Sequence, residues 1–344
     1  MDYCSLLALL IPLMIPMANY SAEHALVDGI EVIRLADAQR RIEVSVVPSI
    51  GNNAFDMKVN GKPILWCPSA NLKELKDKPV QFGNPLLAPW ANRIDGDAYY
   101  AGGKRYLLNP DLKNFRYDNN RKPIHGLLVH AADWKVVELA ADGESARVTS
   151  RLEFWRKPDR MAQFPFAHTI TMTYRLKGGA LEVETLIENN SVETMPLSLG
   201  YHTYYRLSDS PRDDWKVHVA ARETLVLSKE TIPTGEKIPV ALPDPAALKE
   251  HKLDDIFMGL ARDPAGRAEF WVQGQKEKIR VLFGPRYDVG IVWAPQGRDF
   301  ICFEPMVGPT NAFNLAHAGI FKDLQTIPPG GSWKESFWII PEGF

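Results

Sequence analysis

The stretch Thr169–Ile187, TITMTYRLKGGALEVETLI, decides the fold class because two runs of alternating residues flank a pair of glycines. Apolar and polar residues alternate in each run, which gives each run one apolar face and one polar face. The apolar face carries Ile170, Met172, Tyr174 and Leu176 in the first run, and Leu181, Val183, Thr185 and Ile187 in the second. This pattern is typical of antiparallel strands, and Gly178-Gly179 between the runs predicts a tight hairpin turn.

The same signals recur on both sides of this hairpin. Residues 41–47 alternate in the same way, and turn-forming pairs stand at Asn60-Gly61, Gly102-Gly103, Asp142-Gly143 and Gly330-Gly331. Helical patterns are short, at Asn71–Asp77 and Pro245–His251, and nowhere do strands alternate with long helices. We therefore predict an all-β fold, a single large antiparallel β-sandwich with few short helices. A Rossmann fold or an α/β barrel is disfavoured.

Composition excludes several classes of protein. The chain has 344 residues, of which 45% are hydrophobic and 24% charged, as in an average globular protein. Lys and Arg number 40 against 42 Asp and Glu, so no basic excess is present to bind a nucleic acid backbone. Cys4, Cys67 and Cys302 show neither a CxxC pair nor zinc spacing, so we expect no disulfide framework and no structural metal. Whether Cys67 and Cys302 pair depends on their separation in the fold.

The N-terminus carries one apolar run, Leu6–Ala18, LLALLIPLMIPMA. It is too short to span a bilayer as a helix, and Pro12 and Pro16 would break a helix there. We predict a signal peptide over residues 1–22, followed by one domain over 23–344, and hence a periplasmic or secreted protein. The residues before the run include Asp2 and no Lys or Arg, which is atypical of a leader. The alternative is a buried N-terminal segment of a cytoplasmic protein.

The sharpest candidate for chemistry is Glu304, the only charge in the apolar segment Phe300–Met306, FICFEPM. If this segment is a strand, Cys302 and Glu304 share one face. Burial there would raise the carboxyl pKa toward the range of a useful general base. The alternative is a structural Glu paired with an Arg.

Two loop segments also hold polar residues in apolar surroundings. Gly83–Ile94, GNPLLAPWANRI, contains Asn92 and Arg93, and a buried guanidinium there would need an anion or several acceptors. In Pro123–Val129, PIHGLLV, His125 precedes Gly126, which would allow a backbone or a ligand to approach closely. The alternatives are an Arg with its head in solvent and a histidine that serves only packing.

Two further segments complete the set. In Leu197–Leu207, LSLGYHTYYRL, His202 stands among three tyrosines, whose rings suit a sugar site but also a surface strand end. In Leu253–Phe257, LDDIF, the acidic pair is either a solvated turn or the source of one carboxylate for a polar ligand.

Taken in order, these segments resemble the aldose 1-epimerase (galactose mutarotase) family. The resemblance runs from about Ile42 to the C-terminus and rests on residues 49–66, 83–94, 124–128, 164–176, 199–207, 253–257 and 303–305. It implies a large curved antiparallel β-sandwich that interconverts the anomers of free hexoses such as glucose and galactose. It also implies acid–base chemistry without a metal or cofactor.

The resemblance implies roles for individual residues. His202 corresponds to the histidine that protonates the ring oxygen, and Glu304 to the base that takes the proton of the anomeric hydroxyl. His125 and Arg93 correspond to residues that hold sugar hydroxyls, and Asn92 is assigned to substrate binding with them. Asp254, rather than its neighbour Asp255, corresponds to the acidic sugar ligand. One departure is Thr203, where the family commonly has proline after the histidine.

Two alternatives remain open. A hexose-6-phosphate 1-epimerase would need a cationic phosphate site, for which Arg93, Lys104 and Arg105 are candidates. A non-catalytic carbohydrate-binding sandwich, or the β domain of a larger glycoside hydrolase, would share the fold without this activity. The expected partner is a small sugar, with no nucleic acid, no membrane in the mature form, and a monomeric or homodimeric state.

Overall fold

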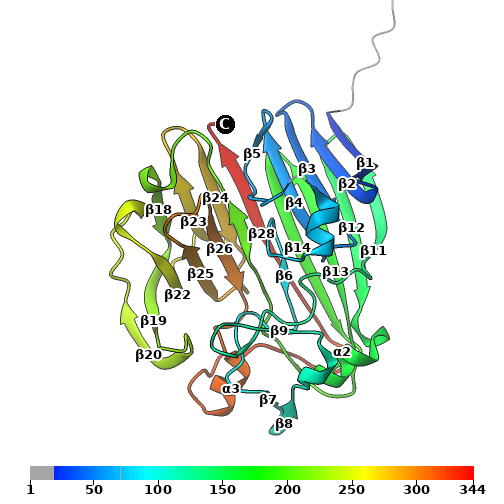
Figure 1. Ribbon diagram of the computed structural model, residues 1–344, viewed down its shortest axis with the longest axis vertical. Coiled ribbons are helices and arrows are strands. Elements are labelled where there is room, and N and C mark those ends of the chain that lie inside the picture. Colours follow the sequence, from blue (N-terminus) through cyan, green and yellow to red (C-terminus); the bar gives the residue numbers. More distant parts are fainter. Residues whose placement is uncertain (1–18, 70) are drawn as a thin grey trace, which may run out of the picture.

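The structure is a computed structural model that describes residues 19–69 and 71–344, and antiparallel strands dominate it (Figure 1). Residues 1–18 of the predicted leader lie outside the described residues, so the leader stays a prediction. Residues 20–22, which the prediction also placed in the leader, already pair with β2 (Ile30–Asp37) as part of the first strand, so the domain begins earlier than the predicted residue 23. In the part of the chain that is described, no helix is long and apolar enough to cross a membrane.

Within these residues the largest sheet has nine strands, and the predicted hairpin lies near its middle. Its strands, in spatial order, are β11 (Lys135–Ala141), β12 (Ala146–Glu153), β13 (His168–Lys177), β14 (Ala180–Asn189), β28 (Ser332–Glu342), β24 (Lys278–Phe283), β23 (Ala268–Gln273), β18 (Lys216–Val219) and β21 (Ala246–Ala247). β13 and β14 pair along their whole length, up to Lys177 opposite Ala180. Gly178 and Gly179 both have positive φ, as a two-residue turn of type I′ requires, so the hairpin is confirmed.

A second sheet lies beside the first and carries most of the candidate site residues. Its strands are β20 (Pro233–Pro239), β19 (Ala221–Leu227), β22 (Leu253–Leu260), β25 (Val289–Ala294), β26 (Ile301–Met306), β16 (Gly200–Tyr201) and β6 (Leu86–Leu87), with β17 (Thr203–Tyr205) also paired to β26. A third sheet contains β1 (Tyr20–Val27), β2 (Ile30–Asp37), β3 (Ile42–Val47), β4 (Asn53–Val59) and β5 (Lys62–Pro63).

The remaining elements are short and connect or cover the sheets. Three two-stranded ribbons pair β7 (Ala98–Ala101) with β8 (Lys104–Leu107), β9 (Arg116–Tyr117) with β10 (Pro123–Ile124), and β15 (Met195–Pro196) with β27 (Thr326–Ile327). The helices are α1 (Leu72–Asp77), α2 (Pro158–Gln163) and α3 (Ala312–His317), with single 3₁₀ turns η1 (Pro110–Leu112), η2 (Phe154–Arg156), η3 (Arg212–Asp214) and η4 (Leu248–Glu250). The helix expected at 71–77 is therefore confirmed, whereas 245–251 forms a short strand and one 3₁₀ turn.

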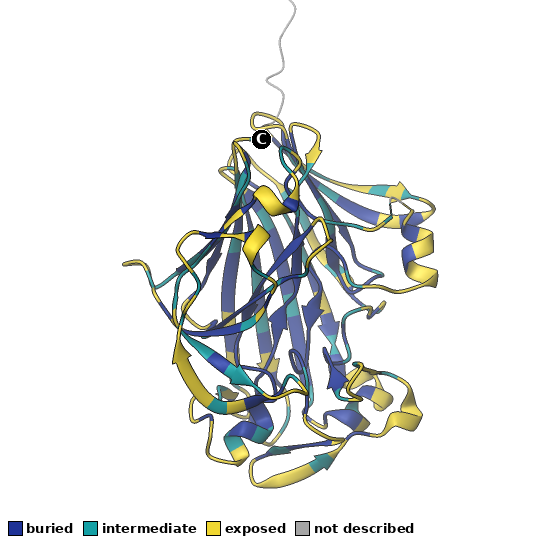
Figure 2. Cartoon of the chain, turned by 60° about the vertical axis from the view of Figure 1, so that its left-hand side comes forward, coloured by how far each residue is buried: buried dark blue, intermediate teal, exposed yellow. Residues whose placement is uncertain are grey.

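The core lies between the large sheet and the other two sheets. Tyr201 of the second sheet packs on Phe337 of β28, with ring centroids 4.8 Å apart. On the other side, the Tyr174 hydroxyl of β13 donates a hydrogen bond of 2.9 Å to the carbonyl oxygen of Asn52, next to β4. Buried strands run through the middle of the molecule, while exposed residues gather in the loops and outer strands (Figure 2). The predicted all-β sandwich is confirmed.

The alternation that decides the fold can be tested in the hairpin itself. Leu181 is fully buried on the inner face, whereas Lys177 is exposed at the turn. We expect Leu181→Ala to lower the free energy of unfolding by about 2–5 kcal/mol because it leaves a cavity. Lys177→Ala should stay within about 0.5 kcal/mol of the wild type. Equal urea midpoints for the two variants would contradict the assignment of the inner face.

Candidate functional site

Glu304 lies in the middle of β26, on the face opposite to the core. Its neighbour Phe303 packs into the core, and Cys302 shares the outer face with Glu304, as the alternation predicted. The Glu304 side chain is only 2% exposed, and its Oε2 atom is buried without a hydrogen-bond partner in the structure. No arginine forms an ion pair with it in the described chain, which argues against a purely structural Glu–Arg pair.

His202 lies directly across from Glu304, in the gap between β16 and β17. The register runs from Gly200 opposite Met306 to Thr203 opposite Phe303, so continuing it places His202 opposite Glu304. The imidazole Nε2 is 3.3 Å from Glu304 Oε1, and the Nδ1 atom is buried without a partner. The pair therefore has one mutual contact and two unsatisfied polar atoms, an arrangement that a polar ligand could complete.

Burial governs the protonation of this pair. It lowers the pKa of His202 to about 3, and the charges of Arg116 and Arg93 act in the same direction. Burial also raises the pKa of Glu304 well above its ordinary value, and the charge of Asp254 raises it further. A buried environment thus favours the neutral form of each group, so that one proton is held by the pair.

Two adjoining loops bring Asn92 and Arg93, from one, and His125, from the other, to this pair. The backbone N–H of His125 donates to the Asn92 carbonyl oxygen at 2.9 Å, and the His125 and His202 rings meet edge to face at 5.4 Å. Asn92 and His125 both have positive φ, which is uncommon for residues other than glycine and frequent at functional sites. Asn92 is buried, with its amide near the Met306 sulfur at 4.0 Å.

Gly126 allows this loop to close. A Cβ atom at Gly126 would lie 2.2 Å from the carbonyl oxygen of Ala88, so no other residue fits without a backbone shift. The group that closely approaches Gly126, beside His125, is therefore the backbone of Ala88 rather than a ligand. His125 itself is 4% exposed, its Nδ1 atom is buried without a partner, and burial lowers its pKa well below the ordinary value. A polar ligand could satisfy this atom.

Arg93 is held by an acidic partner that the sequence did not reveal. Its Nε donates to Asp118 Oδ2 at 2.6 Å, and both side chains are largely buried. Although burial acts to raise the pKa of Asp118, hydrogen bonds from the Lys122 N–H and from Arg93 hold it below its ordinary value. Arg93 is therefore not a loop Arg with its head in solvent. A second cation, Arg116, acts on His125 and His202 from β9.

Asp254 belongs to a strand rather than to a solvated turn. In β22 it pairs with Trp293 of β25, which pairs with Cys302 of β26, so these residues share one face with Glu304. Burial raises the pKa of Asp254, whereas Arg93 lowers it. Asp255 points to the opposite face of the strand. All six predicted site residues thus come together: Asn92, Arg93, His125, His202, Asp254 and Glu304.

An aromatic cluster borders the pair, and the sequence revealed only part of it. Tyr204 stacks on His202 with ring centroids 4.8 Å apart, and Trp293 meets His202 edge to face at 5.6 Å. Trp66 stacks on the far side of Tyr204. Tyr201 and Tyr205, singled out with Tyr204 in the sequence, are fully buried in the core instead. Strand alternation around Thr203 could have separated Tyr204 from Tyr205.

Thr203, which replaces the proline common in the resembling family, points into the core. It is fully buried, and its hydroxyl donates to Asn84 Oδ1 at 2.5 Å. The difference from the family's proline therefore affects the packing of the strand that carries His202.

Cys67 and Cys302 both carry free thiols. Among residues 19–69 and 71–344, no group of three or more His, Cys, Asp or Glu side chains is arranged to hold a metal ion.

The comparison with curated proteins gives distant relatives. The uncharacterized protein YphB of Escherichia coli K12 is 24% identical over 259 residues, which cover 72% of this chain and 79% of that protein. The uncharacterized protein YihR of the same organism is 26% identical over 251 residues, covering 70% and 74%.

Solved structures share the fold over nearly the whole chain. A galactose mutarotase-like protein from Clostridium acetobutylicum superposes with a TM-score of 0.84 at 21% identity, covering 95% of this chain and 99% of that one. The galactose 1-epimerase of Lactobacillus acidophilus NCFM gives 0.71 at 16% identity, covering 94% and 100%. The sequence model of the aldose 1-epimerase family matches residues 32–339. The chain therefore belongs to the aldose 1-epimerase family of isomerases.

Proposed function

We propose that this protein interconverts the α and β anomers of free hexoses, glucose or galactose, with Glu304 and His202 as the acid–base pair. The observation that carries the proposal is the contact of 3.3 Å between the two groups in a buried site. The anomeric hydroxyl and the ring oxygen are bonded to the same carbon atom, so the groups that serve them must lie close together. The unpartnered Glu304 Oε2 atom is available to the sugar.

Ring opening requires one proton to leave and one to arrive. Glu304 removes the proton of the O1 hydroxyl, the bond between C1 and the ring oxygen breaks, and His202 gives its proton to the ring oxygen. The product is an open-chain aldehyde, which rotates about C1–C2 and closes with the roles reversed. For this step the one proton of the pair must lie on His202, so sugar binding would have to draw it from Glu304 across the 3.3 Å contact.

Arg93, His125, Asn92 and Asp254 would hold the hydroxyls away from C1. Anchoring at those positions leaves C1 free to rotate, which the change of anomer requires. Arg93 and Asp254 are also close enough to act on the pKa of Glu304, so a bound sugar would lie between charged groups that can orient it.

The state of the cations favours free sugars over hexose 6-phosphates. Of the three candidates named from the sequence, Arg93 is engaged by Asp118 and Lys104 forms an ion pair with Glu193, which leaves Arg105 alone without an ion pair in the described chain. A dedicated phosphate site would instead present several uncommitted cations. The close His202–Glu304 contact likewise favours an enzyme over a binding module, since simple sugar binding has no need for a buried acid–base pair.

Polarimetry tests this proposal directly. The purified protein should speed the relaxation of fresh α-D-glucose or α-D-galactose without changing the final rotation. Glu304→Gln should lower the rate by about 10²–10⁴-fold because it keeps the size of the side chain and removes the base. Glucose 6-phosphate should compete weakly against glucose. A folded Glu304→Gln variant with wild-type activity would overturn the assignment.

The two histidines should behave differently. We expect His202→Asn to lower kcat sharply with little change in KM, because it removes the group that protonates the ring oxygen. His125→Asn should raise KM as well, because His125 contacts His202 at its edge and would bind the sugar. Steady-state kinetics on both variants gives the comparison, and the opposite pattern would exchange the roles.

The pH dependence of kcat/KM should reflect the burial of the His202–Glu304 pair. Because burial lowers the pKa of His202 to about 3, kcat/KM should not fall as the pH drops through 6.5, the ordinary value for histidine. Activity should be lost at acid pH only when the pair takes up a second proton, and at alkaline pH when it loses its last one. An acidic limb with its midpoint near the ordinary histidine value would show that His202 is not desolvated in solution.

We further propose that the protein is exported. The support is the apolar run at residues 6–18, and the domain begins soon afterwards, since β1 pairs with β2 from Tyr20 onward. Tyr20 is buried, and its hydroxyl accepts a hydrogen bond from the Gly178 N–H at 3.0 Å. N-terminal sequencing of the native protein should give a start at residue 19 or 20, because a later start would remove Tyr20. An intact Met1 in a cytoplasmic fraction would contradict export.

A further inference from the structure

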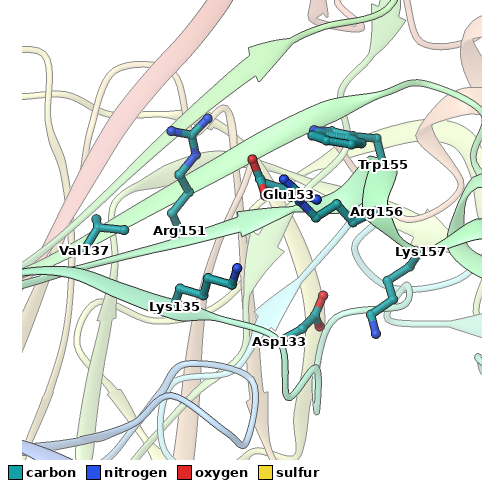
Figure 3. A pocket seen from close by; sticks show the side chains of 8 residues that line it. All are labelled: Asp133, Lys135, Val137, Arg151, Glu153, Trp155, Arg156 and Lys157. Atoms are coloured by element: carbon teal, nitrogen blue, oxygen red, sulfur yellow. Dashed lines mark hydrogen bonds and ion pairs between the residues drawn. The ribbon is translucent and has the colours of Figure 1, made fainter.

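A basic hollow lies on the outer face of the large sheet, away from the core. Its volume is about 720 Å³, and the side chains that line it come from β11, β12 and the turn η2 (Figure 3). Lys135 and Arg151 lie on one side of the hollow, and Trp155, Arg156 and Lys157 lie on the other (Figure 3). None of these residues belongs to the proposed acid–base site.

Lys135 and Arg151 are directly opposite each other in the register of β11 and β12. Like charges at opposite positions of an antiparallel pair destabilise it. Neither side chain forms an ion pair within the described chain, and the same holds for Lys157. The fold thus holds three cations together at one hollow without a direct ion pair to any of them, although Lys135 and Arg151 act through their charges on Glu153, and Lys157 acts on Asp133.

The two carboxylates of the hollow are already engaged. Asp133 accepts two hydrogen bonds from Arg160, at 2.6 and 2.8 Å. Glu153 pairs with Arg156, and this pairing holds the pKa of Glu153 below its ordinary value. Both carboxylates therefore remain charged, and each forms its direct ion pair with an arginine. Lys135, Arg151 and Lys157 add a cationic excess at the hollow and have no direct ion pair, so they can engage an external anion.

An exposed indole completes the hollow. Trp155 is 40% exposed, and the guanidinium of Arg156 lies 4.5 Å from the centre of its ring. Its neighbour Phe154 is buried in the core, so within the turn η2 the Trp155 side chain faces outward. An aromatic surface beside cations suits a ligand that combines apolar C–H faces with negative charge.

A second hollow continues the first. Its volume is about 750 Å³, it shares Asp133 and Lys157 with the first, and it extends to Arg116 and Gly126. Gly126 follows His125 of the candidate site, and Arg116 acts on both site histidines. The basic surface therefore reaches from the outer strands to the loop that bears the sugar-binding candidates.

From these contacts we propose that the basic hollow binds a carboxylate-bearing oligosaccharide. Arg151 and Lys135 would engage carboxylate groups, and Trp155 would stack on a sugar ring. This binding function goes beyond the anomer interconversion proposed above and does not depend on it, because the hollow and the acid–base pair share no residue.

The alternatives of a nucleic acid or an anionic membrane fit less well. The chain has a net charge of −2, so it has no basic excess beyond the hollow to hold a long polyanion. The hollow is about the size of the pockets that hold small ligands, and it offers one exposed aromatic ring rather than a row of them for stacking bases.

Calorimetric titration of the purified protein with tri-galacturonic acid tests the proposal, with neutral galactotriose as the comparison ligand. We expect tri-galacturonic acid to bind more tightly, with an affinity that falls as sodium chloride is added. Lys135→Gln/Arg151→Gln should weaken binding by about tenfold or more, and Trp155→Ala should also weaken it. Lys229→Gln/Lys249→Gln removes two exposed cations elsewhere and should leave the affinity unchanged.

Several results would overturn the proposal. These are equal or absent binding of the two trisaccharides, wild-type affinity in the Lys135→Gln/Arg151→Gln variant, or tighter binding of an oligothymidylate that displaces tri-galacturonic acid. Should the double variant fail to fold, Lys135→Gln alone gives the same comparison. The double variant should keep the wild-type rate on galactose, so failure of this proposal is distinguishable from failure of the epimerase proposal.

Discussion

Burying a carboxyl group in the centre of a strand costs free energy unless a partner compensates for the lost water. Glu304 is the residue of the site to which this constraint applies most strongly. Its nearest polar partner is His202, which the register of β16, β17 and β26 places directly opposite. The pairing strand is interrupted at that residue, so His202 is free to face the carboxyl rather than continue the ladder. The chemistry of the site follows from this one cross-strand contact.

The residues around the contact between His202 and Glu304 set its electrostatic environment from two sides. Pairing of β22, β25 and β26 lines up Asp254, Trp293 and Glu304 on one face. On the other side, Gly126 lets the His125 loop approach the backbone of Ala88. Cations and a carboxylate thus stand around a neutral pair, while aromatic rings exclude water from it. Such an environment makes the protonation of the pair sensitive to the arrival of sugar hydroxyls.

The features of the fold that could be predicted from the sequence are those that depend on local alternation and on turn residues. The hairpin at Gly178-Gly179 and the common face of Cys302 and Glu304 are examples, because period two is a property of the strand itself. Most residues of the site stood out because burying a polar group in an apolar segment costs free energy unless the group has a partner or a functional role. Their convergence had to come from the resemblance to a family, since pairing between distant strands leaves no local signal.

What the sequence did not reveal depends on tertiary contacts. Asp118 and Arg116 lie in a segment rich in polar residues, where a pair to Arg93 looks like any surface ion pair. Tyr201 and Tyr205 looked equivalent to Tyr204 because all three flank His202. Alternation along the strand, which places Tyr201 and Tyr205 on one face and Tyr204 on the other, could have separated them. The basic hollow joins residues of two strands and one turn, so its charges are dispersed along the sequence.

The central claim is that one acid–base pair acts on both oxygens of the anomeric centre. A crystal structure of the Glu304→Gln variant with galactose bound tests it most directly, because the variant should bind the cyclic sugar without opening its ring. The account predicts that the anomeric hydroxyl lies within hydrogen-bond distance of the side-chain amide introduced at position 304, and that the ring oxygen lies within the same distance of His202 Nε2. A sugar bound with C1 turned away from both side chains would contradict it.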